Sequence, residues 1–237
     1  LVVNGEEFPL GQELAEELKK RHPGFTGLLL NVNQEKNNVI LGKTFRLLWG
    51  KGVLTDRLLS CDFEMSPASF YQVNREGAEL LYKEVQKRAD LREGQKVVDL
   101  FCGIGTIGIV ASDRAKRVIG VELNAEAIRD AKINSRMNKI ENIEFYANDA
   151  GRFMVELADA DEHIDVVFMD PPRSGSTEEF LSSVVTLSPR KVVYISCGPD
   201  TLARDLKYLT THGYQVLKIT PFDLFPFTEH TEVVTLL

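Results

Sequence analysis

The pattern of hydrophobic and polar positions changes near Asn74. Before this residue, short apolar runs are punctuated by glycines, which is typical of a small antiparallel sheet. The expected strands are Phe25–Leu30, Asn38–Leu41 and Arg46–Trp49. The preceding segment, Gly11–Arg21, has leucines at helical spacing and acidic residues early, and it predicts an amphipathic helix. We therefore expect a small α+β subdomain over residues 1–66.

Beyond Asn74, continuous apolar segments alternate with helical patterns. Asn74 can cap a helix that runs to about Asp90, and further helices are expected at Ala125–Met137 and Thr201–His212. The expected strands are Lys96–Leu100, Arg117–Val121, Ile143–Tyr146, Ile164–Met169, Lys191–Ser196, Tyr214–Ile219 and Thr231–Leu237. Apolar strands that alternate with helices indicate a parallel sheet covered on both faces.

The last two expected strands have no helix between them. We expect them to pair as a hairpin, which gives an antiparallel strand at the end of the sheet. A seven-stranded α/β sheet with such a hairpin resembles the class I, Rossmann-like fold of S-adenosylmethionine-dependent methyltransferases. The sequence therefore predicts an α/β catalytic domain over residues 67–237.

Composition excludes several classes of protein. The chain has 43% hydrophobic and 27% charged residues, as soluble globular proteins do. No apolar run approaches the roughly 18 to 20 residues of a membrane helix, and no signal peptide is visible. The three cysteines are widely spaced, so we expect no metal site, no disulfides and a cytoplasmic location. The apolar start, Leu1–Val3, lacks an initiator Met and indicates part of a longer protein.

A glycine loop, Gly103–Gly108, follows an expected strand and precedes a helix. It fits the G-x-G-x-x-G pattern of dinucleotide sites, and Glu122 is placed to bind a ribose hydroxyl. Asp99 argues against a dinucleotide, because its carboxylate would repel a pyrophosphate but suits the ammonium and sulfonium of S-adenosylmethionine. Asp149 can reach the adenine amino group, although Asp is also a common helix N-cap. We therefore predict an S-adenosylmethionine site.

Cys197 follows the expected strand Lys191–Ser196, at the carboxyl end where cofactors bind. A cysteine there is more often a small buried hydrophobe. A thiol has a use beside a methyl donor, because carbon 5 of uracil becomes nucleophilic once a thiolate adds to carbon 6. A base must then remove the carbon 5 proton. Glu232 is the candidate base, and apolar neighbours such as Phe227 and Val233 would raise its pKa.

Six segments of the chain resemble the RNA uracil-5 (m5U) methyltransferases, a family that includes tRNA uracil-54 and 23S rRNA enzymes. The matching segments are Ser69–Asn74, Asp99–Gly105, Val121–Glu122, Asp170–Arg173, Ser196–Asp205 and Phe225–Glu232. The resemblance implies that Cys197 is the nucleophile and Glu232 the base. It places the cofactor at Gln72, Phe101, Thr106, Glu122, Asp149 and Asp170. It also implies that Asp170 helps to orient the uracil.

The resemblance implies a structured RNA as partner, with 23S rRNA preferred over uridine 54 of tRNA, a monomeric enzyme, and RNA contact by the small subdomain. The RNA-binding barrel and iron–sulfur cysteines of many members are not in this sequence, so we expect no iron–sulfur cluster. The net charge of -7 requires a local patch or a further segment to bind RNA. Phe70, Tyr71 and Phe227 are candidates to stack on bases, although core packing is favoured for Phe70.

Two other classes stay open at this point. A dinucleotide-dependent oxidoreductase would explain the glycine loop, but Asp99 and the expected hairpin count against it. A non-catalytic RNA-binding module could keep the same fold, but it would not need both Cys197 and Glu232. Cys61 and Cys102 have no partner pattern, and we expect both to serve packing.

Overall fold

The computed structural model describes residues 1–36 and 40–237, which form two compact units. The first unit comprises Leu1–Asp56 with Glu64–Ser69, and the second comprises Arg57–Phe63 with Phe70–Leu237. The expected strand Asn38–Leu41 lies partly outside the described residues, and its last two residues are not in a strand.

The first unit is built on a three-stranded sheet in the order β1-β2-β3. Its elements are β1 (Val2–Val3), α1 (Gly11–Arg21), β2 (Gly27–Val32) and β3 (Thr44–Gly50). Strand β2 pairs antiparallel with β3, as expected, whereas β1 pairs parallel with β2. The expected antiparallel pairing is therefore confirmed for β2 and β3, and the parallel strand β1 was not predicted. The backbone of Val3 accepts from Asn33 N, which continues the parallel pairing beyond β2.

The predicted helix Gly11–Arg21 is confirmed, and it buries Ala15. Asn31 closes the connection from β2 to β3, because its side-chain amide donates to the Gly42 carbonyl at 2.8 Å and its oxygen accepts from Gly42 N at 2.7 Å. A two-stranded sheet, β4 (Leu54–Leu58) with β5 (Cys61–Met65), connects the units, and the division between them passes through both strands.

The second unit is an α/β fold on a seven-stranded sheet of order β11-β12-β10-β9-β6-β7-β8, which confirms the predicted fold class. The strands are β6 (Lys96–Leu100), β7 (Arg117–Glu122), β8 (Ile143–Ala147), β9 (Val166–Met169), β10 (Lys191–Ser196), β11 (Lys218–Phe222) and β12 (Glu232–Leu236). Strands β6 to β10 are parallel, and β12 is antiparallel to both β10 and β11.

Two expectations about the C-terminal hairpin need correction. The antiparallel strand β12 lies inside the sheet, between β10 and β11, rather than at its end. The first hairpin strand begins at Lys218 rather than Tyr214. Gly213 adopts a positive φ of 103°, and Tyr214 N donates to the Leu209 carbonyl, so this segment closes the preceding helix before a strand can begin.

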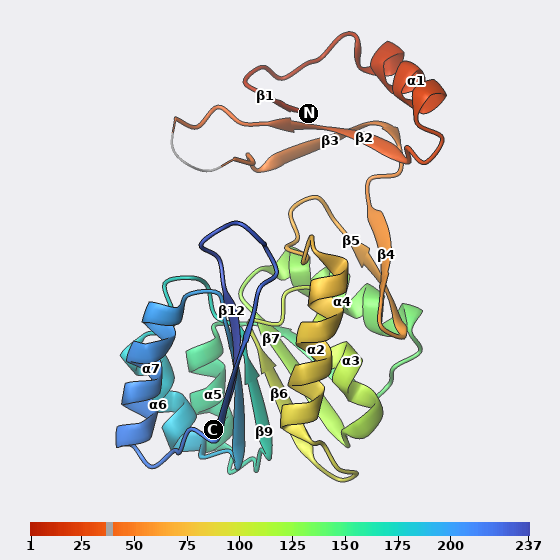
Figure 1. The fold of residues 1–237 in the computed structure, drawn as a ribbon. Coiled ribbons are helices and arrows are strands. Elements are labelled where there is room, and N and C mark those ends of the chain that lie inside the picture. Colours follow the sequence, from red (N-terminus) through yellow and green to blue (C-terminus); the bar gives the residue numbers. More distant parts are fainter. Residues whose placement is uncertain (37–39) are drawn as a thin grey trace. The chain divides into compact units, whose positions relative to one another are not determined.

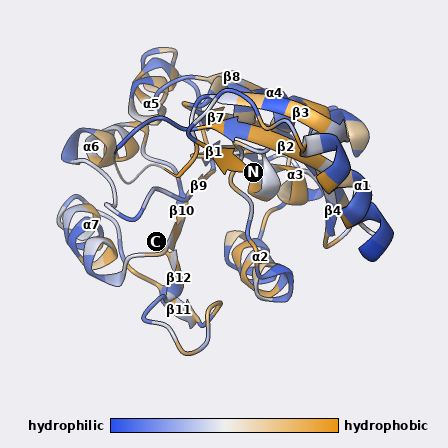
Figure 2. Ribbon diagram, turned by 90° about the horizontal axis from the view of Figure 1, so that it is seen from above, coloured by the Kyte–Doolittle hydropathy of each residue, from blue (hydrophilic) through white to orange (hydrophobic). Residues whose placement is uncertain are grey.

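Helices cover both faces of this sheet (Figure 1). One face carries α5 (Ala150–Asp159), α6 (Glu178–Leu187) and α7 (Pro199–Thr211), and the other carries α2 (Arg75–Ala89), α3 (Thr106–Ala111), followed by the 3₁₀ turn η1 (Ser112–Arg114), and α4 (Ala125–Met137). The helices mix hydrophilic and hydrophobic segments in Figure 2, as elements between a core and solvent do. Among the described residues, no helix is long and apolar enough to cross a membrane.

Candidate functional site

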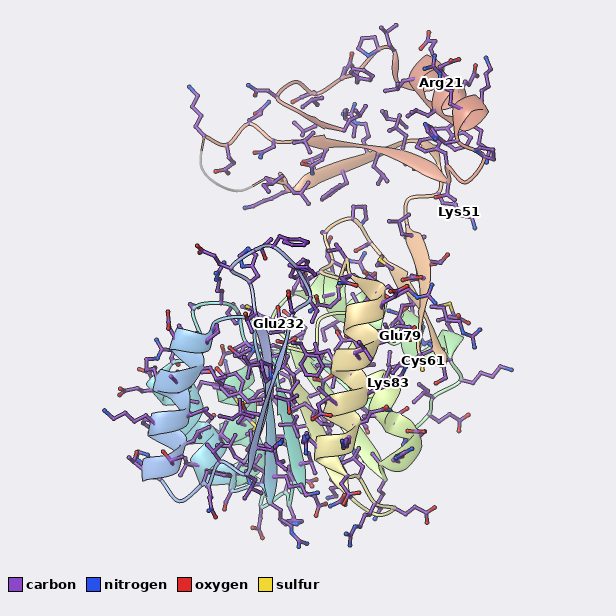
Figure 3. The ribbon with its side chains drawn as sticks, in the orientation of Figure 1. Arg21, Lys51, Cys61, Glu79, Lys83 and Glu232 are labelled. Atoms are coloured by element: carbon purple, nitrogen blue, oxygen red, sulfur yellow. The ribbon has the colours of Figure 1, made fainter. Side chains whose placement is uncertain are left out.

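The predicted site residues gather at the carboxyl edge of the seven-stranded sheet. Strands β9 and β10 end at Met169 and Ser196, and the antiparallel β12 begins at this same edge with Glu232 (Figure 3). Ser196 pairs with Val233, so the next position along each strand sets Cys197 opposite Glu232. The antiparallel insertion of β12 thus brings together two residues that lie far apart in the sequence.

The Cys197 thiol lies in an environment of negative charge. Burial and the carboxylates of Glu232 and Asp170 raise the pKa of Cys197, and the opposing effect of Arg173 does not outweigh them. Glu232 is buried, and burial raises its pKa, as the sequence predicts. Burial also raises the pKa of Asp170 to about 8, with contributions from Glu232 and then Asp99. This group therefore combines a thiol with two carboxyls whose pKa values are raised.

Asp99 is buried at the end of β6, beside the glycine loop. Its Oδ2 accepts a hydrogen bond from Gly108 N at 2.8 Å, and no described residue contacts Oδ1 through a hydrogen bond. Burial raises the pKa of Asp99 to about 7. An unpaired buried carboxylate oxygen is costly unless it meets a ligand or water, which suits a cationic ligand at this loop.

The loop itself is shaped by Gly105 and Glu122. Gly105 has a φ of 84° at the start of α3, and a Cβ there would approach the Phe145 ring to 2.8 Å, so only glycine fits. Glu122 ends β7 and turns toward the loop, where its Oε2 accepts from Gly103 N at 3.3 Å. Its Oε1 accepts from Asn124 N at 2.8 Å. Glu122 is thus fixed beside the loop at two points.

A cavity of about 410 Å³ adjoins the predicted cofactor residues Phe101 and Asp149. Phe101 has a φ of 62° and packs against Phe180, with ring centroids 5.2 Å apart. Asp149 is exposed and caps α5, because its Oδ1 accepts from Arg152 N at 2.9 Å. The helix-cap interpretation of Asp149 is confirmed, and its contact with the adenine amino group stays a prediction. Further lining residues include Ala150, Pro172, Ser176 and Phe180.

Helix α2 brings a buried tyrosine, which the sequence did not single out, next to Thr106 of the glycine loop. Asn74 caps α2 as predicted, accepting from Gly77 N at 3.0 Å, and Gln72 is buried just before it. Tyr82 is buried on the same helix, and its hydroxyl lies 3.4 Å from Thr106 Oγ1. Desolvation raises the pKa of Tyr82, and the charges of Asp170 and Asp99 add to the effect. The helical periodicity from Asn74 could have placed Tyr82 on the buried face.

A buried carboxylate in α7, Asp205, holds the loop that follows Asp170. Its Oδ2 accepts from the Tyr194 hydroxyl at 2.6 Å and from Ser176 N at 2.8 Å. Its Oδ1 pairs with Arg204, whose guanidinium also donates to the Ser176 carbonyl at 2.9 Å. Each acceptor oxygen is satisfied, so this charge is stabilised in the interior. Arg204 and Asp205 lie in a segment that resembles the family, but no role was predicted for either residue.

The predicted stacking residues differ in exposure. Phe70 is 74% exposed, so the interpretation that it packs in the core was wrong. Phe227 is fully exposed and therefore does not provide the apolar surroundings of Glu232, whereas Val233 is buried. Tyr71 is half-buried and lies near Phe63, with centroids 6.4 Å apart.

The two remaining cysteines, Cys61 and Cys102, are buried, and burial raises the pKa of both thiols. Both properties are those of inert packing cysteines. Across residues 1–36 and 40–237, His, Cys, Asp and Glu side chains form no group of three or more that could hold a metal ion.

Solved structures identify the class of protein that this fold defines. A putative S-adenosylmethionine-dependent methyltransferase from Streptococcus mutans matches 95% of this chain and 64% of its own, with a TM-score of 0.66 at 11% identity, which shows the fold alone. The Pyrococcus abyssi tRNA (uracil-54, C5)-methyltransferase, solved in complex with S-adenosyl-L-homocysteine, is 31% identical. Its TM-score is 0.80 over 100% of this chain and 55% of that chain. The fold is that of S-adenosylmethionine-dependent methyltransferases.

Sequence comparisons identify the family. The tRNA (uracil-5-)-methyltransferase family profile matches residues 54–237. Uncharacterized RNA methyltransferases of Caldanaerobacter subterraneus subsp. tengcongensis and Halalkalibacterium halodurans are 39% and 40% identical over 100% of this chain. The chain therefore belongs to the tRNA (uracil-5-)-methyltransferase family, which confirms the predicted resemblance and sets aside the oxidoreductase. It spans about half the length of these relatives, 52% of each.

Proposed function

We propose that this protein transfers a methyl group from S-adenosylmethionine to carbon 5 of a uridine in RNA, with Cys197 as nucleophile and Glu232 as base. The observation that carries the proposal is the juxtaposition of these residues where β10 and β12 meet. A packing cysteine would not need a buried carboxylate opposite it, because burying a carboxylate costs free energy.

Three carboxylates and the cavity would hold the cofactor. Asp99 offers an unpaired buried oxygen to a cation, Glu122 offers its carboxylate to a ribose, and Asp149 lines the cavity of about 410 Å³. Gln72, Phe101, Thr106 and Asp170 complete the proposed cofactor set. S-adenosylmethionine supplies an electrophilic methyl group on a positively charged sulfur. The negative character of this edge suits that charge and opposes a dinucleotide pyrophosphate.

Cys197 acts first in the proposed sequence. Its raised pKa keeps the thiol protonated at rest, so the thiol loses its proton to solvent as it attacks the base. The thiolate then forms a bond to carbon 6 of uracil, and the electron pair of the 5,6 double bond makes carbon 5 nucleophilic. Asp170, protonated in large part at neutral pH, donates a hydrogen bond that orients the base.

Glu232 acts last. Once carbon 5 carries the methyl group, Glu232 removes the proton from that carbon, the double bond re-forms, and the bond from sulfur to carbon 6 breaks. The raised pKa of Glu232 brings a carboxylate closer to the strength that this proton transfer needs. Cys197 leaves as a thiolate and takes the proton from Glu232, which restores the starting state, and S-adenosyl-L-homocysteine is the second product.

Structured RNA is the proposed substrate, because the target base must leave its stack to reach both the thiol and the methyl group. The family resemblance favours 23S rRNA as the substrate. The 31% identity to the Pyrococcus abyssi tRNA enzyme supports uridine 54 of tRNA as the second candidate. The same resemblance leads us to propose a monomeric, cytoplasmic enzyme in which residues 1–66 form the small RNA-contact unit and residues 67–237 the catalytic domain.

Nucleoside analysis tests the proposal. The purified protein is incubated with S-adenosylmethionine carrying a labelled methyl group and with 23S rRNA or tRNA from a strain that lacks m5U. We expect the label in 5-methyluridine from one RNA and not from the other. Label in any other nucleoside, or binding of NAD in preference to S-adenosylmethionine, would contradict the proposed reaction.

A further inference from the structure

The connection from β11 to β12 presents one aromatic ring to solvent. Phe227 is 108% exposed relative to a reference residue, so its whole ring is bare. Its backbone has a φ of 68°, in the left-handed region that side chains with a Cβ disfavour. Exposing a large apolar ring and holding this φ both oppose folding, and full exposure leaves no compensating contact with the described residues.

The loop around Phe227 has a defined conformation. Thr228 donates to the Phe225 carbonyl twice, from its backbone N at 3.1 Å and from Oγ1 at 2.7 Å. His230 N donates to Thr228 Oγ1 at 3.2 Å. The Asn74 side chain donates to the Leu224 carbonyl at 2.6 Å, which ties the loop to the start of α2. The loop thus holds the ring outward by its own hydrogen bonds.

The position of this loop indicates which kind of ligand the Phe227 ring would bind. Phe227 lies on the connection that leads from β11 to Glu232 at the carboxyl edge of the sheet, so a ligand on its ring would bind beside that edge. The chain has a net charge of -7, so overall charge opposes binding of a polyanion. Stacking on an aromatic ring does not depend on phosphate contacts, and it is how proteins hold unpaired bases of RNA.

We propose that Phe227 is a stacking platform for an unpaired RNA base next to the target uridine. This inference rests on the proposed function, since it takes RNA as the substrate. The ring binds the neighbouring base while Cys197 and Glu232 act on the uracil. Phe227 thereby sets affinity for unpaired RNA and takes no part in the chemical steps.

Binding of fluorescein-labelled octauridylate to the full chain, followed by anisotropy, tests this role. Phe227→Ala removes the ring and keeps the disfavoured backbone. Phe227→Gly removes the ring and tolerates the positive φ, so this variant is expected to fold at least as well as wild type. Stacking predicts that both variants weaken binding by about tenfold or more, while Phe227→Trp retains affinity. Leu217→Ala, at an exposed apolar residue before β11, is the matched control and is expected to bind like wild type.

The outcomes separate this inference from the proposed function. Binding of the Gly and Ala variants within twofold of wild type overturns the stacking role, including the case in which the ring serves a protein partner. Binding of S-adenosyl-L-homocysteine, measured on each variant, must remain as in wild type for the comparison to hold. Methyl transfer to RNA is assayed on wild type alone, so its absence contradicts the proposed reaction whatever the octauridylate result.

Discussion

At the two edges of the seven-stranded sheet, the pKa values of acidic groups are shifted in opposite directions. At the amino edge, Lys96 pairs with Glu162 at 2.6 Å, and Arg117 pairs with Glu144 at 3.2 Å. The hydrogen bond from Lys96 lowers the pKa of Glu162, and hydrogen bonds from Tyr146 and Arg117 lower the pKa of Glu144. These carboxylates are stabilised in their ionised forms.

At the carboxyl edge the pKa values move the other way. Burial raises the pKa of Asp99, Asp170, Cys197 and Glu232. Buried groups with raised pKa values reduce stability when they ionise, so a fold keeps them where a ligand or a reaction needs them. The difference between the edges therefore separates residues that stabilise the sheet from residues that we assign to function.

The largest expected effect comes from removing the thiol. Cys197→Ala is expected to lower methyl transfer by more than about a thousandfold, because carbon 5 of uracil then lacks activation. Titration with S-adenosyl-L-homocysteine should give wild-type affinity, since Cys197 is not among the proposed cofactor residues. Normal turnover in this variant would refute the nucleophile assignment.

Glu232→Gln should slow turnover by roughly a hundred- to ten-thousandfold and let a covalent protein–RNA adduct accumulate. The methylated base then keeps its carbon 5 proton, so the bond to Cys197 cannot break. Denaturing electrophoresis with labelled RNA reveals the adduct as a shifted band. Its absence in Glu232→Gln, with Cys197→Ala run as the adduct-free control, would count against Glu232 as the base.

The Asp170→Asn variant tests the raised pKa of Asp170 at the carboxyl edge by its effect on the free energy of unfolding. Burial raises the folded-state pKa of Asp170 to about 8, so the stability contributed by its protonated form is lost as pH rises from the usual range of an aspartate toward 8. The variant cannot ionise, so its gain over wild type should grow from none near pH 4 to about 1–2 kcal/mol at pH 8. Urea unfolding at several pH values measures this. A gain that does not depend on pH would contradict the raised pKa.

Lys96→Met gives the smallest expected effect. The Lys96–Glu162 pair is about one-third exposed, and solvent screens such pairs so that they contribute little to stability. We expect a slight loss in the free energy of unfolding that fades at high salt, with methyl transfer unchanged. A marked loss of activity would show that the two edges are not functionally separate.

The sequence predicted the parts of this molecule that follow local rules. Asn74 caps its helix as expected, and the parallel strands match their apolar runs, because capping and burial act over a few residues. The insertion of β12 beside β10 was not predicted, because strand order depends on contacts distant in sequence. This insertion sets Glu232 opposite Cys197. The chemistry of methylation at carbon 5 had suggested that pair, but the hydrophobic pattern of the sequence does not predict it.

Three residues that were missed or wrongly placed show what local sequence patterns do not predict. Tyr82 lies within an ordinary helical pattern, and only the fold reveals Thr106 beside its hydroxyl. Asp205 looks like a surface charge on a helix until Tyr194 and Ser176 are found to donate to it. Phe70 is apolar and was expected inside, yet it is exposed, because hydrophobicity alone does not determine burial.

The central claim, that Cys197 and Glu232 methylate carbon 5 through a covalent adduct, is tested most directly by tritium release. RNA with tritium at carbon 5 of its uridines is incubated with the wild-type protein and S-adenosylmethionine. The account predicts one tritium released to water for each methyl group incorporated, with release blocked in Glu232→Gln. Methyl incorporation without tritium release would contradict it.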